Sequence, residues 1–318
     1  MKFDAVISGY ISMDRIIKVA SPLRAGRTSI IINSDSEKIY YGGCSTNIAY
    51  ILGKMGLKPL PIIRVGEDNK ANDFLRYLKS ANIELDAVEI IKGEISSYSY
   101  IVSDKDDNHV TMFYPGAMDS RYSKKIDDKL IKNSRIGILT VGSYLDSLEF
   151  YNKCLKHDIP LVFGAKLDYD AFPIDFLKKI LLKSKIIFSN KSEAEDIQSI
   201  FNIDDMAKLF SLGNAEIMIV TLGEEGSLCY EKTSSSFKLH KIKPYKLEKV
   251  VDATGAGDAY IGGFLYGYLN GKSVIDCCLM GSVMSSFVLE KVGCTTNIPT
   301  SKQFYNRLNE YINFYNSY

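Results

Sequence analysis

The amino-acid sequence predicts an α/β protein in which a mostly parallel sheet is covered by helices on both faces, with a small second sheet outside it. Two observations carry this prediction. From Leu60 onward, short apolar runs alternate with stretches of helical period, which is the pattern of parallel strands joined by crossover helices. Residues 11–41 and 96–115 instead hold short alternating runs broken by turn residues, and such runs are typical of hairpin strands.

The elements follow in order along the chain. A first strand is expected at 3–9, and the runs of the small sheet at 16–19, 28–32, 38–41, 97–103 and 110–114. Main-sheet strands are expected at 61–65, 135–141, 161–163, 185–188 and 216–221, an antiparallel pair at 226–230 and 236–242, and a short strand at 250–251. Helices are expected at 48–55, 71–80, 145–156, 174–182, 191–200, 206–212, 259–269, 274–290 and 301–314. The α/β domain then comprises 1–10, 42–95 and 116–318, and the small sheet 11–41 and 96–115.

The composition argues against several kinds of partner. The 318 residues hold 39 Lys and Arg against 38 Asp and Glu, a net charge of +1, so no strong field draws the chain to nucleic acid or an anionic membrane. No apolar run reaches membrane length. The six cysteines form no C-x-x-C pair. We therefore expect a cytoplasmic protein with reduced thiols and a small-molecule partner.

The most informative stretch runs from Asp252 to Asp258, where small residues separate a β-branched pair from a helical pattern. Gly255 and Gly257 allow a sharp turn and leave N–H groups uncovered at the positive end of a helix dipole, which is a place that binds anions. Asp258 falls in the first helical turn and is a candidate base. The alternative is an ordinary strand-to-helix turn in which Asp258 only compensates the dipole.

Two better-known glycine motifs are excluded. A dinucleotide fingerprint would need glycine where Tyr260 stands, and this also argues against a nicotinamide-dependent oxidoreductase. A phosphate loop of the Walker type would need glycine where Tyr266 stands, five residues before Gly271.

A second candidate site combines Asp14 with the pair Gly42 and Gly43 and with Asn47. Asp14 follows a strand, and paired glycines before a helix allow close approach of the backbone to a ligand. Asn47 offers both a donor and an acceptor. The alternative is a helix cap made by Ser45 or Thr46.

Two further sites lie at expected strand ends. Asn190 and Glu193 stand one helical turn apart, which suits water-mediated Mg²⁺ binding but equally a capping box. Thr221, Gly223 and Gly226 offer a hydroxyl and two glycines, either for a phosphate or simply for a hairpin turn. The helix at 274–290 also carries a face of small residues, for packing or for a flat ring: Cys278, Gly281, Ser282, Ser285 and Ser286.

Taken in order, Gly42-Gly43 with Asn47, Asn190 with Glu193, and 252–258 resemble the ribokinase family of carbohydrate and nucleoside kinases, also called the PfkB family. The resemblance implies a ribokinase-like three-layer α/β/α sandwich with a small β lid. It further implies transfer of the γ-phosphoryl group of ATP to a primary hydroxyl of a sugar or ribonucleoside. A catalytically silent nucleotide-binding regulator with the same fold is the alternative.

The resemblance also implies a role for each motif residue. Asp258 matches the catalytic base, and the N–H groups of Gly255, Ala256 and Gly257 match the anion hole. Substrate binding falls to Asp14, Gly42, Gly43 and Asn47, and nucleotide binding to Asn190, Thr221, Gly223 and Gly226. Glu193 matches the residue that organises Mg²⁺ through water, and Asp252 matches a ligand of a monovalent cation, K⁺. The resemblance also allows a homodimer formed through the lid.

The chain departs from the family pattern after the strand at 161–163, where Gly164-Ala165-Lys166-Leu167-Asp168 replaces an Asp-x-Asn motif. Our hypothesis is that Lys166 supplies a cation near phosphate or substrate. Cys44 also differs from many sugar kinases. Residues 110–117 look similar to archaeal members that act on nucleosides, where aromatic residues can stack a base, although they can equally pack against each other.

Overall fold

The fold is built on one nine-stranded sheet. The computed structural model describes residues 2–106 and 108–316. The strands are β1 (Phe3–Ser8), β4 (Pro59–Gly66), β5 (Val88–Ile91), β8 (Ser134–Leu139), β9 (Leu161–Gly164), β10 (Ile186–Asn190), β11 (Ile217–Thr221), β12 (Ser227–Lys232) and β13 (Phe237–Ile242). Their order is β13-β12-β11-β10-β9-β8-β1-β4-β5. The strands from β11 to β5 are parallel, and β12 and β13 are antiparallel additions at one edge.

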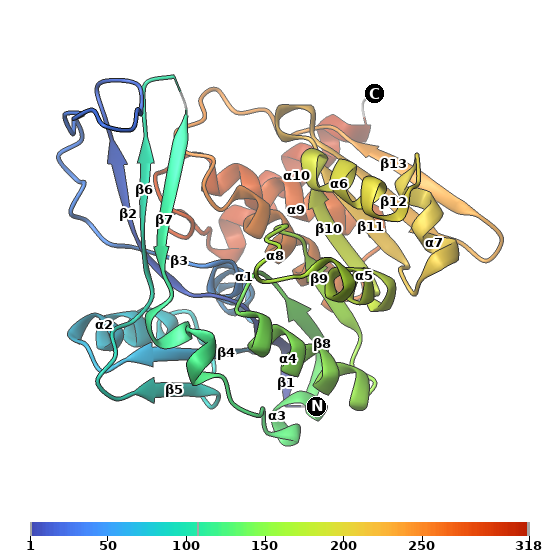
Figure 1. The fold of residues 1–318 in the computed structure, drawn as a ribbon. Coiled ribbons are helices and arrows are strands. Elements are labelled where there is room, and N and C mark those ends of the chain that lie inside the picture. Colours follow the sequence, from blue (N-terminus) through green and yellow to red (C-terminus); the bar gives the residue numbers. More distant parts are fainter. Residues whose placement is uncertain (1, 107, 317–318) are drawn as a thin grey trace.

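Two groups of helices cover the two faces of this sheet (Figure 1). One face carries α1 (Cys44–Lys54), α2 (Asn69–Lys79), α8 (Ala256–Leu269), α9 (Val274–Val288) and α10 (Ser301–Asn316). The other carries α3 (Asp128–Lys132), α4 (Tyr144–Lys156), α5 (Ile174–Lys183), α6 (Lys191–Phe201) and α7 (Leu209–Leu212). The strands supply both cores by alternation: Ile217 and Ile219 of β11 face the first group, while Met218 and Val220 face the second. The predicted three-layer α/β/α class is confirmed.

A separate small sheet stands to one side of the main sheet, with the order β3-β2-β6-β7 (Figure 1). Its strands are β2 (Ser12–Lys18), β3 (Tyr40–Gly42), β6 (Tyr98–Ser103) and β7 (His109–Tyr114). The prediction of a strand at 28–32 is wrong, since only an isolated bridge joins Ile31 to Val19. The side chains of Ile30 and Ile32 are 73% and 60% exposed, so burial does not hold this apolar run in a sheet. The homodimer expected through this sheet stays a prediction, which a molecular mass measured in solution by light scattering would test.

The structure differs from the sequence-based elements at other places too, among them the short helix α3, which was not expected. Residues 250–251 form no strand, because the Val251 N–H donates to Leu289 O just after α9 (2.8 Å) rather than to a neighbouring strand. The strand β5 was not expected, since it is a short edge strand that is only partly buried. The helix expected at 206–212 is a 3₁₀ turn, η3 (Met206–Lys208), followed by the single turn of α7. Among the described residues, none of the helices combines the length and apolarity needed to cross a membrane.

Close packing of α8 against α9 fixes where the N-terminus of α8 lies. A Cβ atom on Gly263 would come within 2.5 Å of Met280 O and 3.0 Å of Gly281 Cα. Gly281 in turn lies against the ring of Tyr260, which a Cβ atom would approach to 2.9 Å. Two serines of the small-residue face hydrogen-bond to neighbouring backbone: Ser285 donates to Ala256 O, and Ser282 accepts from the Tyr245 N–H. The face serves packing.

Replacing Gly263 with Ala is expected to destabilise the protein by about 1–3 kcal/mol, the usual cost of overpacking. Alanine is intrinsically better than glycine in a helix by about 1 kcal/mol, so a loss of stability isolates the steric term. The free energy of unfolding from urea titration provides the measurement. Gly267→Ala is the matched control, because its nearest obstacle is the flexible end of Met280, Sδ at 2.9 Å. A Gly263→Ala variant as stable as the wild type would contradict the close packing.

Candidate active site

The N-terminus of α8 is shaped by a glycine that no other residue replaces easily. Gly255 has φ of 79° and is the N-cap of α8, with no side-chain cap. A left-handed conformation of this kind costs little only for glycine. A Cβ atom at this position would also lie 2.6 Å from Cys294 Cβ. The backbone can therefore turn into the helix while the loop after α9 packs directly against it.

The first turn of α8 leaves backbone donors uncovered. Within the described residues, the N–H groups of Gly255 and Gly257 have no hydrogen-bond acceptor. Ala256 differs from the expectation, because its N–H closes the turn onto Ala253 O at 3.2 Å. Gly257 also has open space where a Cβ would stand. The helix start thus offers an anion the uncovered amides of Gly257 and Gly255 together with the positive end of the dipole.

Asp258 lies in this turn and is held by a residue far away in the sequence. The Nδ2 of Asn47 in α1 donates to Asp258 Oδ2 at 2.8 Å, and the Cys44 thiol faces the same carboxylate. Burial raises the pKa of Asp258, while the hydrogen bonds from Asn47 and Cys44 and the charge of Lys166 act in the opposite direction. Burial also raises the pKa of the Cys44 thiol, so it stays protonated beside the acid.

A cavity of about 240 Å³ opens at the carboxyl ends of β8, β9, β10 and β11. In open parallel sheets, ligands bind at this edge. Four elements meet there: the start of α1, the start of α6, the first turns of α8 and the loop after β9. The lining residues are Cys44, Thr140, Gly164, Ala165, Lys166, Phe188, Ser189, Asn190, Glu193, Thr221, Gly257, Asp258, Tyr260 and Ile261. Three of the predicted motifs therefore reach one cavity.

Asn190 and Glu193 line this cavity and also form a complete capping box for α6. Asn190 Oδ1 accepts from the Glu193 N–H at 2.9 Å, and Glu193 Oε2 accepts from the Asn190 N–H at 2.8 Å. Burial raises the pKa of Glu193. Thr221 reaches the cavity from the end of β11, whereas Gly223 and Gly226 flank the adjoining turn and are not among the lining residues.

Asp14 lies at the junction of the two sheets rather than in the cavity wall. It is 6% exposed and accepts hydrogen bonds from the hydroxyls of Ser12 and Ser99. A Cβ atom on Gly42 would come within 2.2 Å of Asp14 Oδ2. The lack of a side chain at Gly42 is thus what makes room for the carboxylate.

Gly43 lets the start of α1 approach the chain after β1. It has φ of 94°, and a Cβ atom would lie 2.4 Å from Tyr10 O. The helix-cap alternative for Ser45 and Thr46 is wrong: α1 has no side-chain cap, and both hydroxyls donate to backbone carbonyls instead. Close approach, not capping, explains the paired glycines.

Asp252 joins the two loops that flank the start of α8. Its Oδ1 accepts from the Thr254 N–H and hydroxyl at 2.9 and 2.6 Å, and its Oδ2 accepts from the Gly293 N–H at 2.9 Å. Among the described residues, no cluster of three or more His, Cys, Asp or Glu side chains is arranged to hold a metal ion.

The structure adds Thr140 and Tyr10, which the sequence analysis missed, and shows the packing partner of Phe113, one of the aromatic residues noted at 110–117. Thr140, after β8, lines the cavity, and its hydroxyl donates to Ser8 O at 3.1 Å. The rings of Tyr10 and Phe113 lie 4.8 Å apart, so an aromatic side chain of β7 reaches across to the chain after β1. Neither contact has a local pattern that would have revealed it, because each joins residues distant in sequence.

Three comparisons place this geometry among known proteins. The model of the pfkB family of carbohydrate kinases matches residues 2–301. A nucleoside kinase of Methanocaldococcus jannaschii is 32% identical over 308 residues, which cover 95% of this chain and 96% of the relative. Its solved structure superposes with a TM-score of 0.84 at 28% identity, covering 97% of this chain and 99% of the other.

A nucleoside kinase of Burkholderia thailandensis, solved in complex with inosine, has a TM-score of 0.86 at 22% identity and covers 97% of this chain and 98% of its own. This likeness concerns the fold. The family match extends over nearly the whole chain, and the M. jannaschii relative is similar over the same length. The chain therefore belongs to the pfkB family of carbohydrate kinases and is a phosphotransferase that uses an alcohol group as acceptor.

Proposed function

We propose that this chain transfers the γ-phosphoryl group of ATP to a primary hydroxyl of a ribonucleoside, with Asp258 as the general base. The observation that carries the proposal is the arrangement at the start of α8. A half-buried carboxylate and the uncovered Gly257 N–H lie in one helical turn that lines the cavity. An oxygen nucleophile and the phosphoryl group that it attacks need a base and an anion site this close together.

The reaction then follows from these positions. The acceptor oxygen bonds to the γ-phosphorus while its proton passes to the Asp258 carboxylate. The bond from the γ-phosphorus to the β–γ bridging oxygen breaks, and ADP leaves with that electron pair. The N–H groups of Gly255 and Gly257 stabilise charge on the phosphoryl oxygens. Positioning and charge stabilisation supply most of the catalysis in phosphoryl transfer.

Magnesium fits the donors at the start of α6. Glu193 uses one carboxylate oxygen in the capping box and keeps the other for a metal-bound water, and Asn190 fixes its place. Mg²⁺ usually keeps several waters and binds through one or two carboxylates together with substrate phosphates. When bound, it would neutralise charge on the β- and γ-phosphates.

The choice of a nucleoside as acceptor rests on the lid-side aromatic residues and on the M. jannaschii relative. We propose that Asp14, Gly42, Gly43 and Asn47 hold the ribose hydroxyls. Phe113 is 39% exposed and lies against Tyr10, beside this hydroxyl-binding group. A ring in such a place can stack a base. The silent regulator is disfavoured, since Asp258 is present and oriented by Asn47.

Asp258→Asn is expected to lower kcat by about 10²-fold or more, the size of effect expected for a general base. The amide keeps the shape but accepts no proton, so binding of ADP should stay close to that of the wild type. Steady-state kinetics and calorimetric titration with ADP measure the two quantities. Asp276→Asn serves as the control, because Asp276 is also a first-turn acid, of α9, outside the cavity. Near-normal turnover of Asp258→Asn would remove this residue from the role.

The pH profile of kcat should show an acid limb set by Asp258. The base must be ionised to accept a proton, so the rate falls as pH decreases through its pKa. Because burial raises that pKa, the limb should lie at higher pH than that of an exposed aspartate, about 3.9. Circular dichroism over the same range separates this effect from unfolding. A rate that stays constant down to the pKa of an exposed aspartate would contradict the assignment.

The proposed acceptor is tested by an ADP-release screen of ribose, fructose, 2-keto-3-deoxygluconate and a set of ribonucleosides. We expect release with ribonucleosides. Phe113→Ala should then raise the nucleoside KM about tenfold, since stacking on one base contributes about 1–3 kcal/mol. Met112→Ala is the matched control, because adjacent strand residues face opposite sides of a sheet. Activity on sugars alone would overturn the nucleoside assignment while leaving the kinase intact.

A monovalent cation beside the start of α8 is a further part of the proposal. The Asp252 carboxylate and neighbouring backbone carbonyls are hard oxygen donors, which suit K⁺. Replacing K⁺ by choline at constant ionic strength should lower kcat roughly fivefold or more, as expected for typical coupling between two bound ligands. Constant ionic strength removes differences in screening. Equal rates in K⁺ and choline would exclude an activating cation site.

A further inference from the structure

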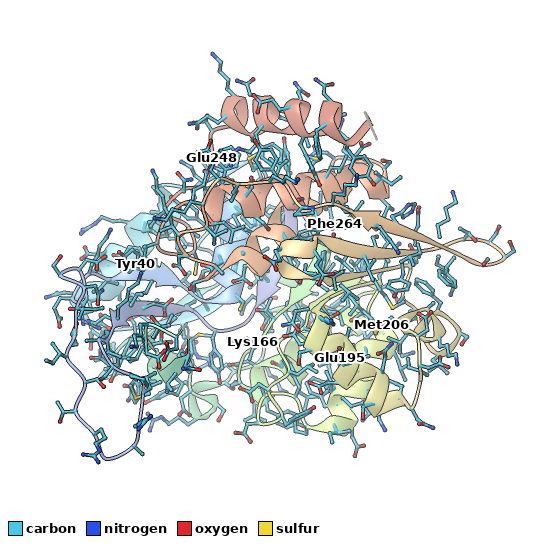
Figure 2. All side chains as sticks on the ribbon, turned by 90° about the horizontal axis from the view of Figure 1, so that it is seen from above. Tyr40, Lys166, Glu195, Met206, Glu248 and Phe264 are labelled. Carbon is cyan, nitrogen blue, oxygen red and sulfur yellow. The ribbon has the colours of Figure 1, made fainter. Side chains whose placement is uncertain are left out.

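The loop after β9 places a lysine, Lys166, at the edge of the cavity. Lys166 lines the cavity and, within the described residues, makes no hydrogen bond or ion pair. In Figure 2 it lies between Tyr40, on the side of the small sheet, and Glu195 of α6. A cation left without a partner at the edge where ligands bind is available to an anion.

The backbone that carries Lys166 is anchored on both sides. Before it, the Ala165 N–H donates to Phe188 O at 2.8 Å. After it, Asp168 Oδ1 accepts from the N–H groups of Asp170 and Ala171 at 3.0 and 3.1 Å, and Phe172 is fully buried. Lys166 therefore projects from a fixed turn, and only its side chain must reorient to meet a ligand.

The charges around the cavity show what Lys166 faces. Among its lining residues Lys166 carries the one positive charge, against the carboxyl groups of Glu193 and Asp258. Burial raises the pKa values of Asp14, Glu193 and Asp258, and the charge of Lys166 acts in the opposite direction on all three. Lys166 thus stands within electrostatic reach of the proposed base, the metal-organising acid and the acceptor site.

We propose that Lys166 binds the phosphoryl group in transfer, contacting the γ-phosphate of the donor opposite the Gly257 N–H. This inference rests on the proposed kinase function and decides between the two roles that the sequence left open. The proposed acceptor, a ribonucleoside, is neutral and offers no charge to pair with an ammonium group. The donor carries its charge into a cavity that already holds two acids, where it needs cations to offset the repulsion. Lys166 forms no covalent bond in this step.

The inference predicts that removal of Lys166 weakens the binding of nucleotides that carry a γ-phosphate and leaves the binding of ADP nearly unchanged. We compare Mg²⁺-bound AMP-PNP, a non-hydrolysable ATP analogue, with Mg²⁺-bound ADP by calorimetric titration of wild type and Lys166→Met. The affinity for AMP-PNP should fall roughly tenfold or more, as expected for loss of a charge-assisted hydrogen bond, while the affinity for ADP changes less than about twofold. Equal changes for both nucleotides, or none, would overturn the inference.

Kinetics supply a second readout that a merely structural residue would not reproduce. Lys166→Met should lower kcat about 10²-fold or more, as for loss of a single donor to a transition-state oxyanion, with little change in the KM of the acceptor. Lys166→Arg should recover most of the rate, because it restores the charge. If Lys166 only adjusted the ionisation of Asp258, the lost rate would return at higher pH. Such a recovery would count against phosphate binding.

Lys191→Met is the matched control for both measurements. Lys191 opens α6 at the same edge of the sheet but is not among the cavity-lining residues, so its removal should leave nucleotide affinities and kcat near those of the wild type. An equal effect of Lys191→Met would show that only general positive charge matters, and would overturn the specific role of Lys166. The calorimetric titrations with AMP-PNP and ADP do not depend on turnover. A wild type that phosphorylates none of the acceptors would therefore reject the proposed function without removing the test.

Discussion

The absence of a side chain at Gly255 is the constraint on which the site depends. Because this residue turns left-handed and leaves space for Cys294, α8 can begin against the loop that follows α9. Asp252 ties the same loop to the approach of α8 through the Gly293 N–H. The first turn of α8 is consequently fixed on one side, and the hydrogen bond from Asn47 to Asp258 fixes it on the other. Pre-organised donors and acids need no rearrangement when charge develops.

In the proposed function, the two sheets bind different substrates. The carboxyl ends of β9, β10 and β11 open onto a cavity that is lined by Lys166, Glu193 and Asp258 and by the Gly257 backbone, and this set suits a phosphorylated ligand. The junction with the small sheet supplies Asp14, 6% exposed and held by two serine hydroxyls, beside an aromatic pair. That junction suits a neutral polyol attached to a ring. Asp258 lines the cavity and accepts a hydrogen bond from Asn47, so in the proposed reaction the acceptor hydroxyl and the phosphoryl group meet beside it.

Local sequence patterns predicted the strands and helices whose burial follows from their own periodicity. They failed where contacts between distant residues determine the conformation. Alternation predicted strands such as β11, and small residues before a helical period placed Asp258 in a first turn. The run at 28–32 is equally β-branched but stays exposed, since no neighbouring strand covers it. Val251 pairs with Leu289 instead of a strand, and the Ala256 N–H closes onto Ala253. Contacts such as Cys294 with Gly255 join residues far apart in sequence, so no spacing rule reveals them.

Structural and functional interpretations of the same residue proved compatible at several positions. Asn190 and Glu193 complete a capping box and still face the cavity, because a carboxylate has more acceptor sites than the cap requires. Asp252 likewise links two loops while remaining an oxygen donor. Hydrogen bonds within the protein hold these groups in place before a ligand arrives. Lys166 has no such bond within the described residues, so its ammonium group is available to an incoming anion. In the proposed reaction, this cation adds to the uncovered amides at the start of α8 and offsets the repulsion between the phosphate and the acids of the site.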